Sequence, residues 1–278
     1  MIGILILGQG FIGTYLADLL RNRDFSFAAT TTDGRNNTIK WRLPSSSSDV
    51  ADYALPSANT IIVTFPLQGS AAATQLIEGY LGYHDNKIRP QWIYLGSTRP
   101  FKEIPSTRFT KPDIIAGGPR VEAEELIISK YKGKVLNLAG LWGGERVPEK
   151  WSRFYTEKEK LRQKLSARGL HLVHGADVAR AILAVITVPE SGRWLVSDGS
   201  TYDMLQILLR DERVRGLLEE LMHEAEVRRM LGADKVEDVR LGESEVTLRI
   251  DPSHFWAAVA IQPEYPYVIG EPDPFTGF

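Results

Sequence analysis

The chain has 278 residues, enough for one large α/β domain or for a core domain with a smaller one attached. Its 33 Lys and Arg residues nearly balance 35 Asp and Glu residues, and no long run of one sign indicates a nucleic-acid groove or a membrane-binding face. The absence of cysteine excludes disulfides, thiolate metal sites and a cysteine nucleophile. The apolar N-terminal stretch lacks a basic leader, and no window approaches the ~20 apolar residues of a membrane span. We therefore expect a cytoplasmic protein without a metal site and without nucleic-acid or membrane partners.

The first half of the chain alternates short apolar runs with helical patterns, which is typical of βαβ units and a parallel sheet. Strands are predicted over residues 2–7, 25–30, 60–65, 92–95 and 135–139, and helices over 14–23, 70–81 and 120–131. A polar loop at 44–49 ends in Asp49, a candidate helix cap.

The second half is less regular. Its pattern predicts a charged helix over 149–169, a strand over 170–173, a helix over 177–186 capped by Asp177, a strand over 193–196 and charged helices over 203–231. Val246, Leu248 and Ile250 alternate like one face of a half-buried strand, and the proline-rich residues 262–278 predict an extended strap.

These elements predict an α/β fold, a doubly wound Rossmann sheet with a smaller C-terminal substrate-binding region. We place the Rossmann core at residues 1–140 and the substrate-binding region at 141–278. About 170–200 of the latter is expected to return to the core.

Three glycines after the first strand carry the clearest functional signal. Gly8, Gly10 and Gly13 have G-x-G-x-x-G spacing between an apolar strand and an amphipathic helix. Gly8 would make the tight turn, Gly10 would let a pyrophosphate approach the backbone, and Gly13 would let the helix pack on the strand. The helix N-terminus offers free N–H groups to phosphates. The motif predicts a dinucleotide site that also includes Phe11 and Ile12.

The end of the second strand bears on the choice of nucleotide. Thr32 stands at the strand end, Asp33 follows slightly late for a ribose-binding acid, and Arg35 is placed to meet a 2′-phosphate. This favours NADP over NAD, with a solvated loop cation as the alternative interpretation of Arg35. The predicted cofactor-binding residues at later strand ends are Phe65, Pro66 and Ser97.

Four segments carry a resemblance to a known family. They are "GQGFIG" at 8–13, "WIYLGSTRPF" at 92–101, "LNLAGLWGGER" at 136–146 and "LHLVHGADVARAI" at 170–182. They resemble motifs of the extended short-chain dehydrogenase/reductase family, the NAD-dependent epimerase/dehydratase group. The resemblance implies an NAD(P)-binding enzyme that acts on a small organic molecule.

The segment "AGGPRVEAEEL" at 116–126 departs from the family. Members normally use a Ser or Thr, a Tyr as general acid/base, and a Lys four residues later that lowers the pKa of the Tyr. The resemblance places Ala116 at the Tyr position and Arg120 at the Lys position. Arg120 would still bind ribose hydroxyls or phosphate, but its guanidinium stays protonated. Because "RVEAE" resembles a Tyr-less subgroup, we interpret the loss as a trait of that subgroup.

Other residues must then supply the chemistry. The resemblance aligns Thr98 with the catalytic Ser/Thr, and strand-end capping is its alternative role. His174 and Glu145 are further catalytic candidates, with a loop-ordering role and a solvated turn as their alternatives. Three hypotheses follow: an NAD(P)-dependent reductase, epimerase or dehydratase without the usual Tyr, a non-redox isomerase, lyase or cyclase, and a non-catalytic NAD(P) sensor. A C-terminal strap lying over the pocket would favour an enzyme.

Overall fold

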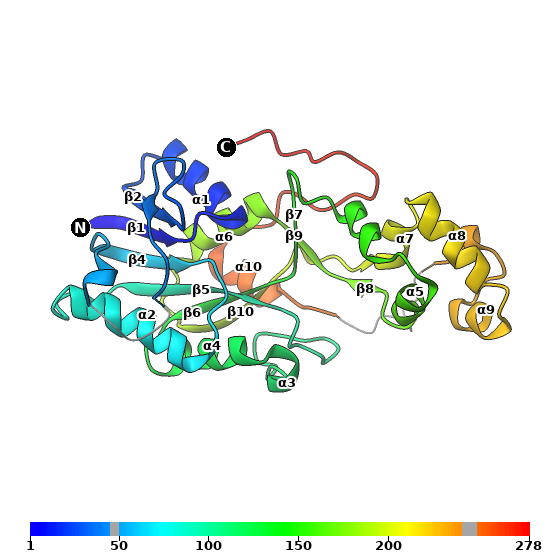
Figure 1. Ribbon diagram of the computed structural model, residues 1–278, viewed down its shortest axis with the longest axis horizontal. Helices are drawn as coiled ribbons and strands as arrows, with labels where there is room; N and C mark the ends of the chain where they lie inside the picture. The colour runs from blue at the N-terminus through cyan, green and yellow to red at the C-terminus, as the bar shows by residue number, and fades with distance from the viewer. Residues whose placement is uncertain (45–49, 241–248) are drawn as a thin grey trace.

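A seven-stranded parallel sheet forms the centre of the protein (Figure 1). The computed structural model describes residues 1–44, 50–240 and 249–278. The strand order is β10-β6-β5-β4-β1-β2-β3, which confirms the predicted doubly wound Rossmann fold. The strands are β1 (Ile2–Leu7), β2 (Phe27–Thr31), β3 (Ile39–Lys40), β4 (Ala58–Val63), β5 (Gln91–Ser97), β6 (Lys134–Leu138) and β10 (Gly192–Val196).

Helices cover both faces of this sheet. In Figure 1, α1 (Phe11–Asn22) and α6 (Gly175–Val185) lie on one face, and α2 (Gly69–Tyr83) and α4 (Pro119–Ser129) lie on the other. The alternation along β1 shows why its run is apolar throughout: Ile4 and Ile6 pack in the α1/α6 cluster, whereas Leu5 and Leu7 pack in the opposite one.

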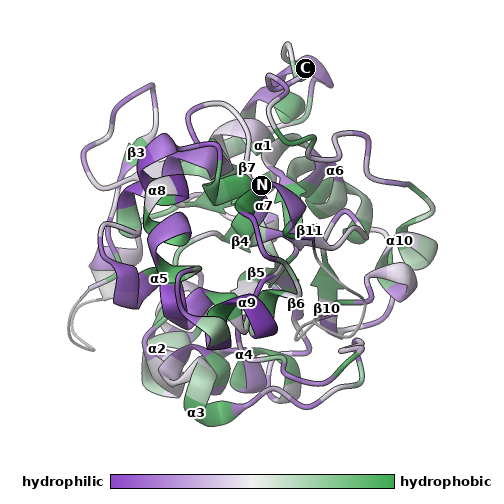
Figure 2. Ribbon diagram, turned by 90° about the vertical axis from the view of Figure 1, so that its right-hand side faces the viewer, coloured by the Kyte–Doolittle hydropathy of each residue, from purple (hydrophilic) through white to green (hydrophobic). Residues whose placement is uncertain are grey.

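A second group of helices lies at a distance from the main sheet. It contains α5 (Lys158–Leu165), α7 (Met204–Leu208), α8 (Glu212–Leu221) and α9 (Ala225–Leu231), which pack around their own apolar cluster (Figure 1). Figure 2 shows α5 and α8 as largely hydrophilic ribbons, in contrast to the hydrophobic strands of the sheet. The short strands are β7 (Gly140–Trp142), β8 (Gly169–Leu170), β9 (Leu172–His174) and β11 (Tyr202–Asp203). The division of the chain at residue 140 stays a prediction.

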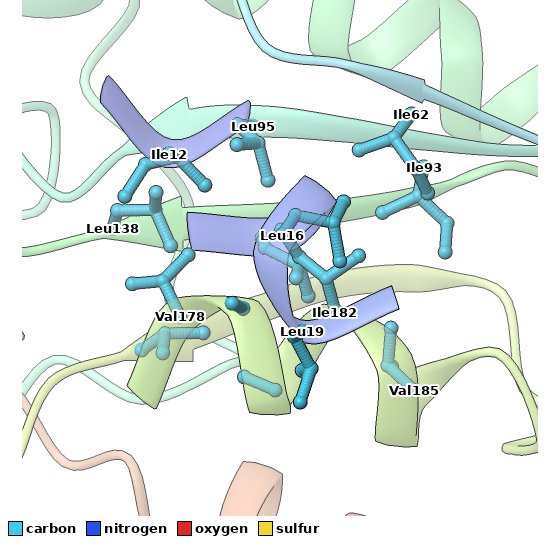
Figure 3. Close-up of a cluster of buried hydrophobic side chains, with 14 of the residues drawn as sticks. Ile12, Leu16, Leu19, Ile62, Ile93, Leu95, Leu138, Val178, Ile182 and Val185 are labelled. Carbon is cyan, nitrogen blue, oxygen red and sulfur yellow. The ribbon is translucent and has the colours of Figure 1, made fainter. Parts of the chain in front are cut away.

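Burial against the sheet fixes the direction of α1. Ile12 and Leu16 of α1 meet Val178 and Ile182 of α6 in one buried cluster (Figure 3). Their side chains lie over the sheet, so the start of α1 is held at the carboxyl end of β1. The strand order reverses between β1 and β4, and ligands of open α/β sheets bind at such switch points.

The predicted helix over 149–169 is wrong. The structure has a 3-10 helix, η2 (Pro148–Phe154), and then α5, with an extended residue Glu157 before α5 begins. In one continuous helix, Tyr155 and Leu161 would point about 120° apart around the axis. The break lets both side chains pack in the same cluster.

Other elements differ less from the prediction. The strand expected over 170–173 is two strands, β8 and β9, paired with β11 and β7 respectively. Residue Asp177 does not cap α6, because the Nδ1 of His174 accepts the Ala176 amide at 3.1 Å instead. The short strand β3 was not predicted, and β2 begins two residues later than expected because Asp24, with φ of 54°, turns the chain before it.

The remaining elements are η1 (Val50–Tyr53), α3 (Ile114–Gly117), η3 (Val236–Asp238) and α10 (Ser253–Val259). Residues 262–278 contain no helix or strand, as the strap prediction requires. The predicted cap at Asp49 and the predicted strand residues Val246 and Leu248 lie outside the described residues.

Candidate functional site

The glycine loop has the geometry that its spacing predicts. Gly8 has φ of 98°, a conformation that favours glycine, and its amide donates to the Thr30 hydroxyl at 3.0 Å. A Cβ on Gly13 would lie 2.5 Å from the carbonyl oxygen of Gly8, so the third glycine allows α1 to pack against the loop. A Cβ on Gly10 would meet nothing within 4 Å. Gly10 therefore faces open space, while the other two glycines are needed for the turn itself.

The start of α1 can bind an anion. The amides of Phe11, Ile12 and Gly13 belong to the first turn of α1, where helical N–H groups have no carbonyl partner within the helix. The first turn also contains no acidic residue that would compete for them. A phosphate beside Gly10 would meet these donors and the positive end of the helix dipole.

A cavity of about 240 Å³ adjoins the loop. It brings together three residues that the sequence predicts, Gly8, Thr32 and Phe65, with Trp41 and Leu43, which it does not. The rings of Trp41 and Phe65 lie 6.5 Å apart, and an apolar cavity between aromatic rings suits a flat base such as adenine. Thr30 and Arg42 also line it.

A second cavity, of about 440 Å³, brings Gly10 and Phe11 together with Arg35 and Glu145. Its other lining residues are Gln9, Thr14, Tyr15, Asp18, Asn36, Gly144 and Phe275.

Arg35 of this cavity is paired. Its Nη1 lies 3.0 Å from Oδ2 of Asp33, and both side chains are more than half exposed. The Thr31 hydroxyl, and then the amide and guanidinium of Arg35, hold the pKa of Asp33 below its usual range. A ligand phosphate would therefore have to compete with Asp33 for Arg35.

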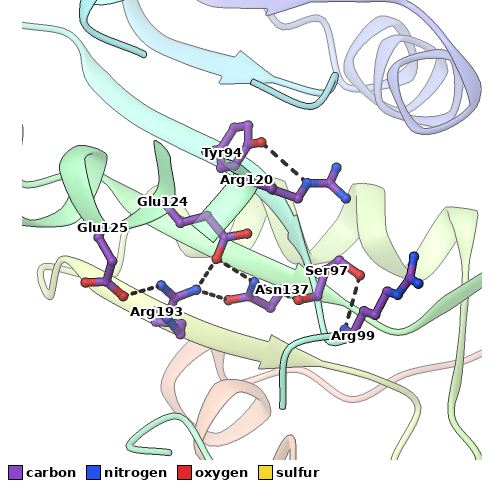
Figure 4. Close-up of polar contacts among 8 residues, drawn as sticks. All are labelled: Tyr94, Ser97, Arg99, Arg120, Glu124, Glu125, Asn137 and Arg193. Carbon is purple, nitrogen blue, oxygen red and sulfur yellow. Dashed lines mark hydrogen bonds and ion pairs between the residues drawn. The ribbon is translucent and has the colours of Figure 1, made fainter. Parts of the chain in front are cut away.

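Two predicted site residues lie at the carboxyl end of β5: Ser97 is its last residue (Figure 4), and Thr98, the catalytic candidate, follows it. Thr98 is 8% exposed, and within the described ranges its hydroxyl makes one contact, a long one of 3.4 Å to the Leu138 carbonyl. The Ser97 hydroxyl accepts the Arg99 amide at 3.2 Å. The Thr98 hydroxyl can thus turn to a ligand at little cost, whereas Ser97 already shapes the turn after the strand.

Arg120 approaches β5 from α4. Its Nε lies 3.5 Å from the hydroxyl of Tyr94, which also accepts the Leu67 amide at 3.0 Å (Figure 4). Burial raises the pKa of Tyr94, so this phenol stays protonated. The contact positions the guanidinium, and Tyr94 is too enclosed to reach a substrate.

Ala116 and Arg120 belong to different helices. Ala116 lies in α3, whose first turn is capped by Asp113 through the amides of Ile115 and Ala116, at 2.9 and 3.2 Å. Arg120 is the second residue of α4, which begins at Pro119. The four-residue spacing therefore does not stack the two residues on one helix face, and the Ala116 methyl supplies no proton donor.

Two other catalytic candidates are poorly placed for proton transfer. The His174 ring is fully buried, its Nδ1 accepts the Ala176 amide, and its Nε2 lies 3.2 Å from a carboxylate oxygen of Asp273. Both nitrogens are thus engaged, which supports the loop-ordering role. The side chain of Glu145 is fully exposed and lies 3.7 Å from Nζ of Lys150.

The described ranges hold no group of three or more His, Cys, Asp or Glu side chains arranged to bind a metal. Over the same ranges, no helix combines the length and the hydropathy needed to cross a bilayer.

Trp41, Leu43 and Phe275 line these cavities without having been marked by a sequence pattern. Trp41 follows the two-residue strand β3, which is too short to leave a periodic signal. Phe275 comes from the strap, and only its "PDPF" context, an aromatic residue in a proline-rich segment, marks it in the sequence.

Solved structures match this fold over nearly its whole length. MoeE5 in complex with UDP-glucose and NAD has a TM-score of 0.63 and 15% identity, covering 95% of this chain and 94% of that one. UDP-glucose 4-epimerase from Thermotoga maritima, with UDP-glucose, has a TM-score of 0.61, 15% identity and the same coverages. UDP-N-acetylglucosamine 4-epimerase from Bacillus cereus has a TM-score of 0.59, 12% identity and, again, 95% and 94% coverage.

No family model matches the sequence, and no curated protein matches it either. The structural matches confirm that the chain has the fold of the NAD-dependent epimerase/dehydratase group over about 95% of its length. At these identities the likeness establishes the fold alone.

Proposed function

We propose that this protein binds NAD(P) at the glycine loop and acts as an atypical short-chain dehydrogenase/reductase on a small organic molecule. The open approach at Gly10, between the free amides of α1 and the apolar cavity at Trp41, carries the proposal. The pyrophosphate would meet the amides of Phe11 and Ile12, and the adenine would enter the cavity beside Phe65. Pro66, which follows Phe65, would border the same region.

The nicotinamide end would then extend towards the carboxyl end of β5. Arg120 is the cation closest to the position of the family's Lys, and its guanidinium would hold ribose hydroxyls or a phosphate oxygen. Its contact with Tyr94, and the packing of α4 on the sheet, would keep it there.

The bound cofactor would supply hydride transfer, and the protein would supply orientation and charge. The Thr98 hydroxyl would donate a hydrogen bond to the substrate carbonyl. Together with the charge of Arg120, it would stabilise negative charge that develops on the carbonyl oxygen. Reduction, epimerisation and dehydration all require this stabilisation, and the substrate itself is a candidate source of the proton that Ala116 does not provide.

The absence of a Tyr at position 116 also favours a second function. The site keeps its glycine loop and its cation, but Ala116 carries no acid, His174 has both nitrogens engaged and Glu145 is fully exposed. A non-redox isomerase, lyase or cyclase would need orientation and hydrogen-bond donors more than a proton relay. The third candidate, a non-catalytic sensor, is disfavoured because the strap packs against Tyr15 and His174 in the isolated chain.

Nucleotide choice depends on Arg35. Its position beside the cavity at Gly10 favours NADP, provided that the guanidinium exchanges Asp33 for a 2′-phosphate. If NAD binds instead, Asp33 and Thr32 would form hydrogen bonds with the ribose hydroxyls.

Titration with NADH and NADPH tests the cofactor site. Assays of NAD(P)H oxidation with a panel of carbonyl compounds, and of NAD+ or NADP+ reduction and of isomerised or dehydrated product with UDP-glucose, then test the reaction. We expect saturable binding of at least one nucleotide and turnover of at least one substrate that depends on it. Turnover that is the same with and without nucleotide would shift the assignment to the non-redox alternative. The absence of binding by either nucleotide would refute the cofactor site.

A further inference from the structure

The strap, residues 262–278, is held along its length by specific contacts. Its backbone amides donate to side chains that come from three separate elements, α6, β11 and η2, while its last carbonyl accepts from α1. These contacts are Glu264 and Tyr265 with Asp177, Tyr267 with the Tyr202 hydroxyl, Gly270 with Glu149, and Phe278 with Asn22. The segment is thus a built part of the fold despite having no regular secondary structure.

Asp273 joins the strap to the loop after β7. Its carboxylate accepts the Gly144 amide at 2.6 Å and the Phe275 amide at 2.9 Å. It also faces Nε2 of His174, 3.2 Å away. Because Nδ1 of His174 accepts the Ala176 amide, the hydrogen of the neutral ring lies on Nε2 and is donated to Asp273. One carboxylate therefore satisfies donors from three parts of the chain.

A series of ring contacts, called the circuit below, connects the strap to the glycine loop. The Arg146 guanidinium, two residues after Gly144, lies 4.3 Å from the centre of the Phe11 ring. Phe11 contacts Tyr15 at 5.3 Å, and Tyr15 contacts Phe275 at 5.4 Å between ring centres. Phe11 is the first residue of α1 and one of the predicted phosphate-binding residues.

The residues of this circuit are closely packed. A Cβ on Gly175 would lie 2.4 Å from the Tyr15 ring, and a Cβ on Gly143 would lie 2.2 Å from Nε2 of His174. In such close packing, a displacement of Phe275 or Asp273 must move Tyr15 or the 143–146 loop. Phe275 and Gly144 also line the 440 Å³ cavity that contains Gly10 and Arg35.

We propose that the strap forms one wall of the nucleotide site, and that Asp273 and Phe275 are positioning residues that hold Phe11 and the glycine loop in the binding conformation. This inference rests on the nucleotide site proposed above. By linkage, nucleotide binding should in turn hold the strap more firmly against α1.

The test compares NADPH and NADH affinities of the full chain and of Asp273→Ala, Asp273→Asn and Phe275→Leu. Because coupling between sites is commonly 5-fold or more, we expect Asp273→Ala to raise Kd about ten-fold. Asp273→Asn should have a smaller effect, since its amide oxygen can still accept from Gly144. The controls Glu271→Gln and Thr276→Ala change exposed strap residues and should leave Kd unchanged.

Hydrogen exchange with and without nucleotide supplies a second readout, because a strap with only a structural role would not exchange more slowly when nucleotide is added. We expect added nucleotide to slow exchange of the Phe275 and Gly144 amides in the unmodified protein, and Asp273→Ala to speed exchange of Gly144 without nucleotide. If Asp273→Ala does not fold, Phe275→Leu, which keeps an apolar side chain, tests the same circuit.

The outcomes separate the two claims. Nucleotide binding by the unmodified protein with the same Kd in every folded strap variant, or with no change in strap exchange, would overturn the role of the strap and leave the proposed function intact. If the unmodified protein binds neither nucleotide, the proposed function fails and the positioning role fails with it. The exchange of Gly144 in Asp273→Ala would still report the contact between strap and loop.

Discussion

Glu124 of α4 and Arg193 of β10 form a buried ion pair, with side chains 0% and 7% exposed. Glu124 also accepts from Asn137 of β6 at 3.0 Å, and Arg193 donates to the same amide at 2.9 Å (Figure 4). A Cβ on Gly96 of β5 would lie 2.4 Å from Glu124, so the pair fills the space that this glycine leaves. The network ties the helix that carries Arg120 to three strands.

Breaking this pair should destabilise the protein. We expect Glu124→Leu to lower the free energy of unfolding by about 3 kcal/mol, because Arg193 is left buried and loses its main partner. Glu125→Gln removes the exposed partner of Arg193 and should change stability by no more than about 0.5 kcal/mol. Urea unfolding of the two variants and the unmodified protein measures both values. Equal stabilities of Glu124→Leu and Glu125→Gln would contradict this account.

Replacing Arg120 should weaken nucleotide binding without unfolding the protein. The Arg120 side chain is only partly buried, and its contact with a described residue is the long one to Tyr94, so its loss costs the fold little. If it holds the ribose or a phosphate, Arg120→Ala should raise Kd for the nucleotide about ten-fold or more, because charge-assisted hydrogen bonds are worth ~1.5–3 kcal/mol.

Arg120→Lys should recover part of the affinity, since it restores the charge without the planar fork. The surface variant Arg229→Ala on α9 is the matched control. Unchanged nucleotide affinity in Arg120→Ala would remove Arg120 from the site.

Replacing Arg35 should alter cofactor preference. Removal of this guanidinium should lower NADPH affinity while leaving NADH affinity nearly unchanged, because only NADPH carries the 2′-phosphate. Asp33→Asn, which frees Arg35 from its ion pair, should have the opposite effect on NADPH. Parallel titrations of both variants with both cofactors measure the ratio of affinities. An Arg35→Ala variant that keeps this ratio would assign Arg35 to the solvated loop.

Acid should loosen the strap. Burial acts to raise the pKa of Asp273, but the amides of Gly144 and Phe275 and the ring of His174 outweigh it and bring the pKa below its usual range. A carboxyl whose pKa is lower in the folded state stabilises that state above its unfolded pKa, near 4, and loses this contribution as pH falls through the folded value.

We therefore expect hydrogen exchange at Gly144 to accelerate below about pH 4 relative to an unstructured reference. In Asp273→Asn the exchange should be faster at neutral pH and should lack this step. Profiles of identical shape in the two proteins would show that another group controls the strap.

Local patterns predicted the parts of the fold whose contacts are local. The strand, the glycine turn and the helix at residues 2–22 follow from an apolar run, three glycines and one amphipathic period, each readable within a short window. Thr98 follows from the resemblance of "WIYLGSTRPF" to the family's strand and loop, which is also a short local segment.

The rest of the site depends on contacts between distant residues. Asp273 reaches Gly144 over 129 residues, and Arg193 reaches Glu124 over 69, and no periodicity encodes either pair. The sequence predicts Asp177 as the cap of α6 because acids commonly cap helices, but the strap amides of Glu264 and Tyr265 donate to this carboxylate instead. Only the tertiary structure shows which backbone amides bind a given carboxylate.

The central claim is that the glycine loop binds a dinucleotide, and Gly10→Val tests it most directly. A Cβ at this position meets no protein atom within 4 Å, so the variant should fold. Its thermal midpoint should fall somewhat, because φ of −87° and ψ of −147° lie outside the region that residues with side chains favour. The added side chain would occupy the space that a pyrophosphate needs. Gly216→Ala on α8, where a Cβ also meets nothing, is the control.

Titration of these variants and the unmodified protein with NADPH and NADH is the decisive measurement. The account predicts saturable binding by the unmodified protein and by Gly216→Ala, and loss of binding in a folded Gly10→Val. Equal nucleotide affinity in all three proteins would contradict it.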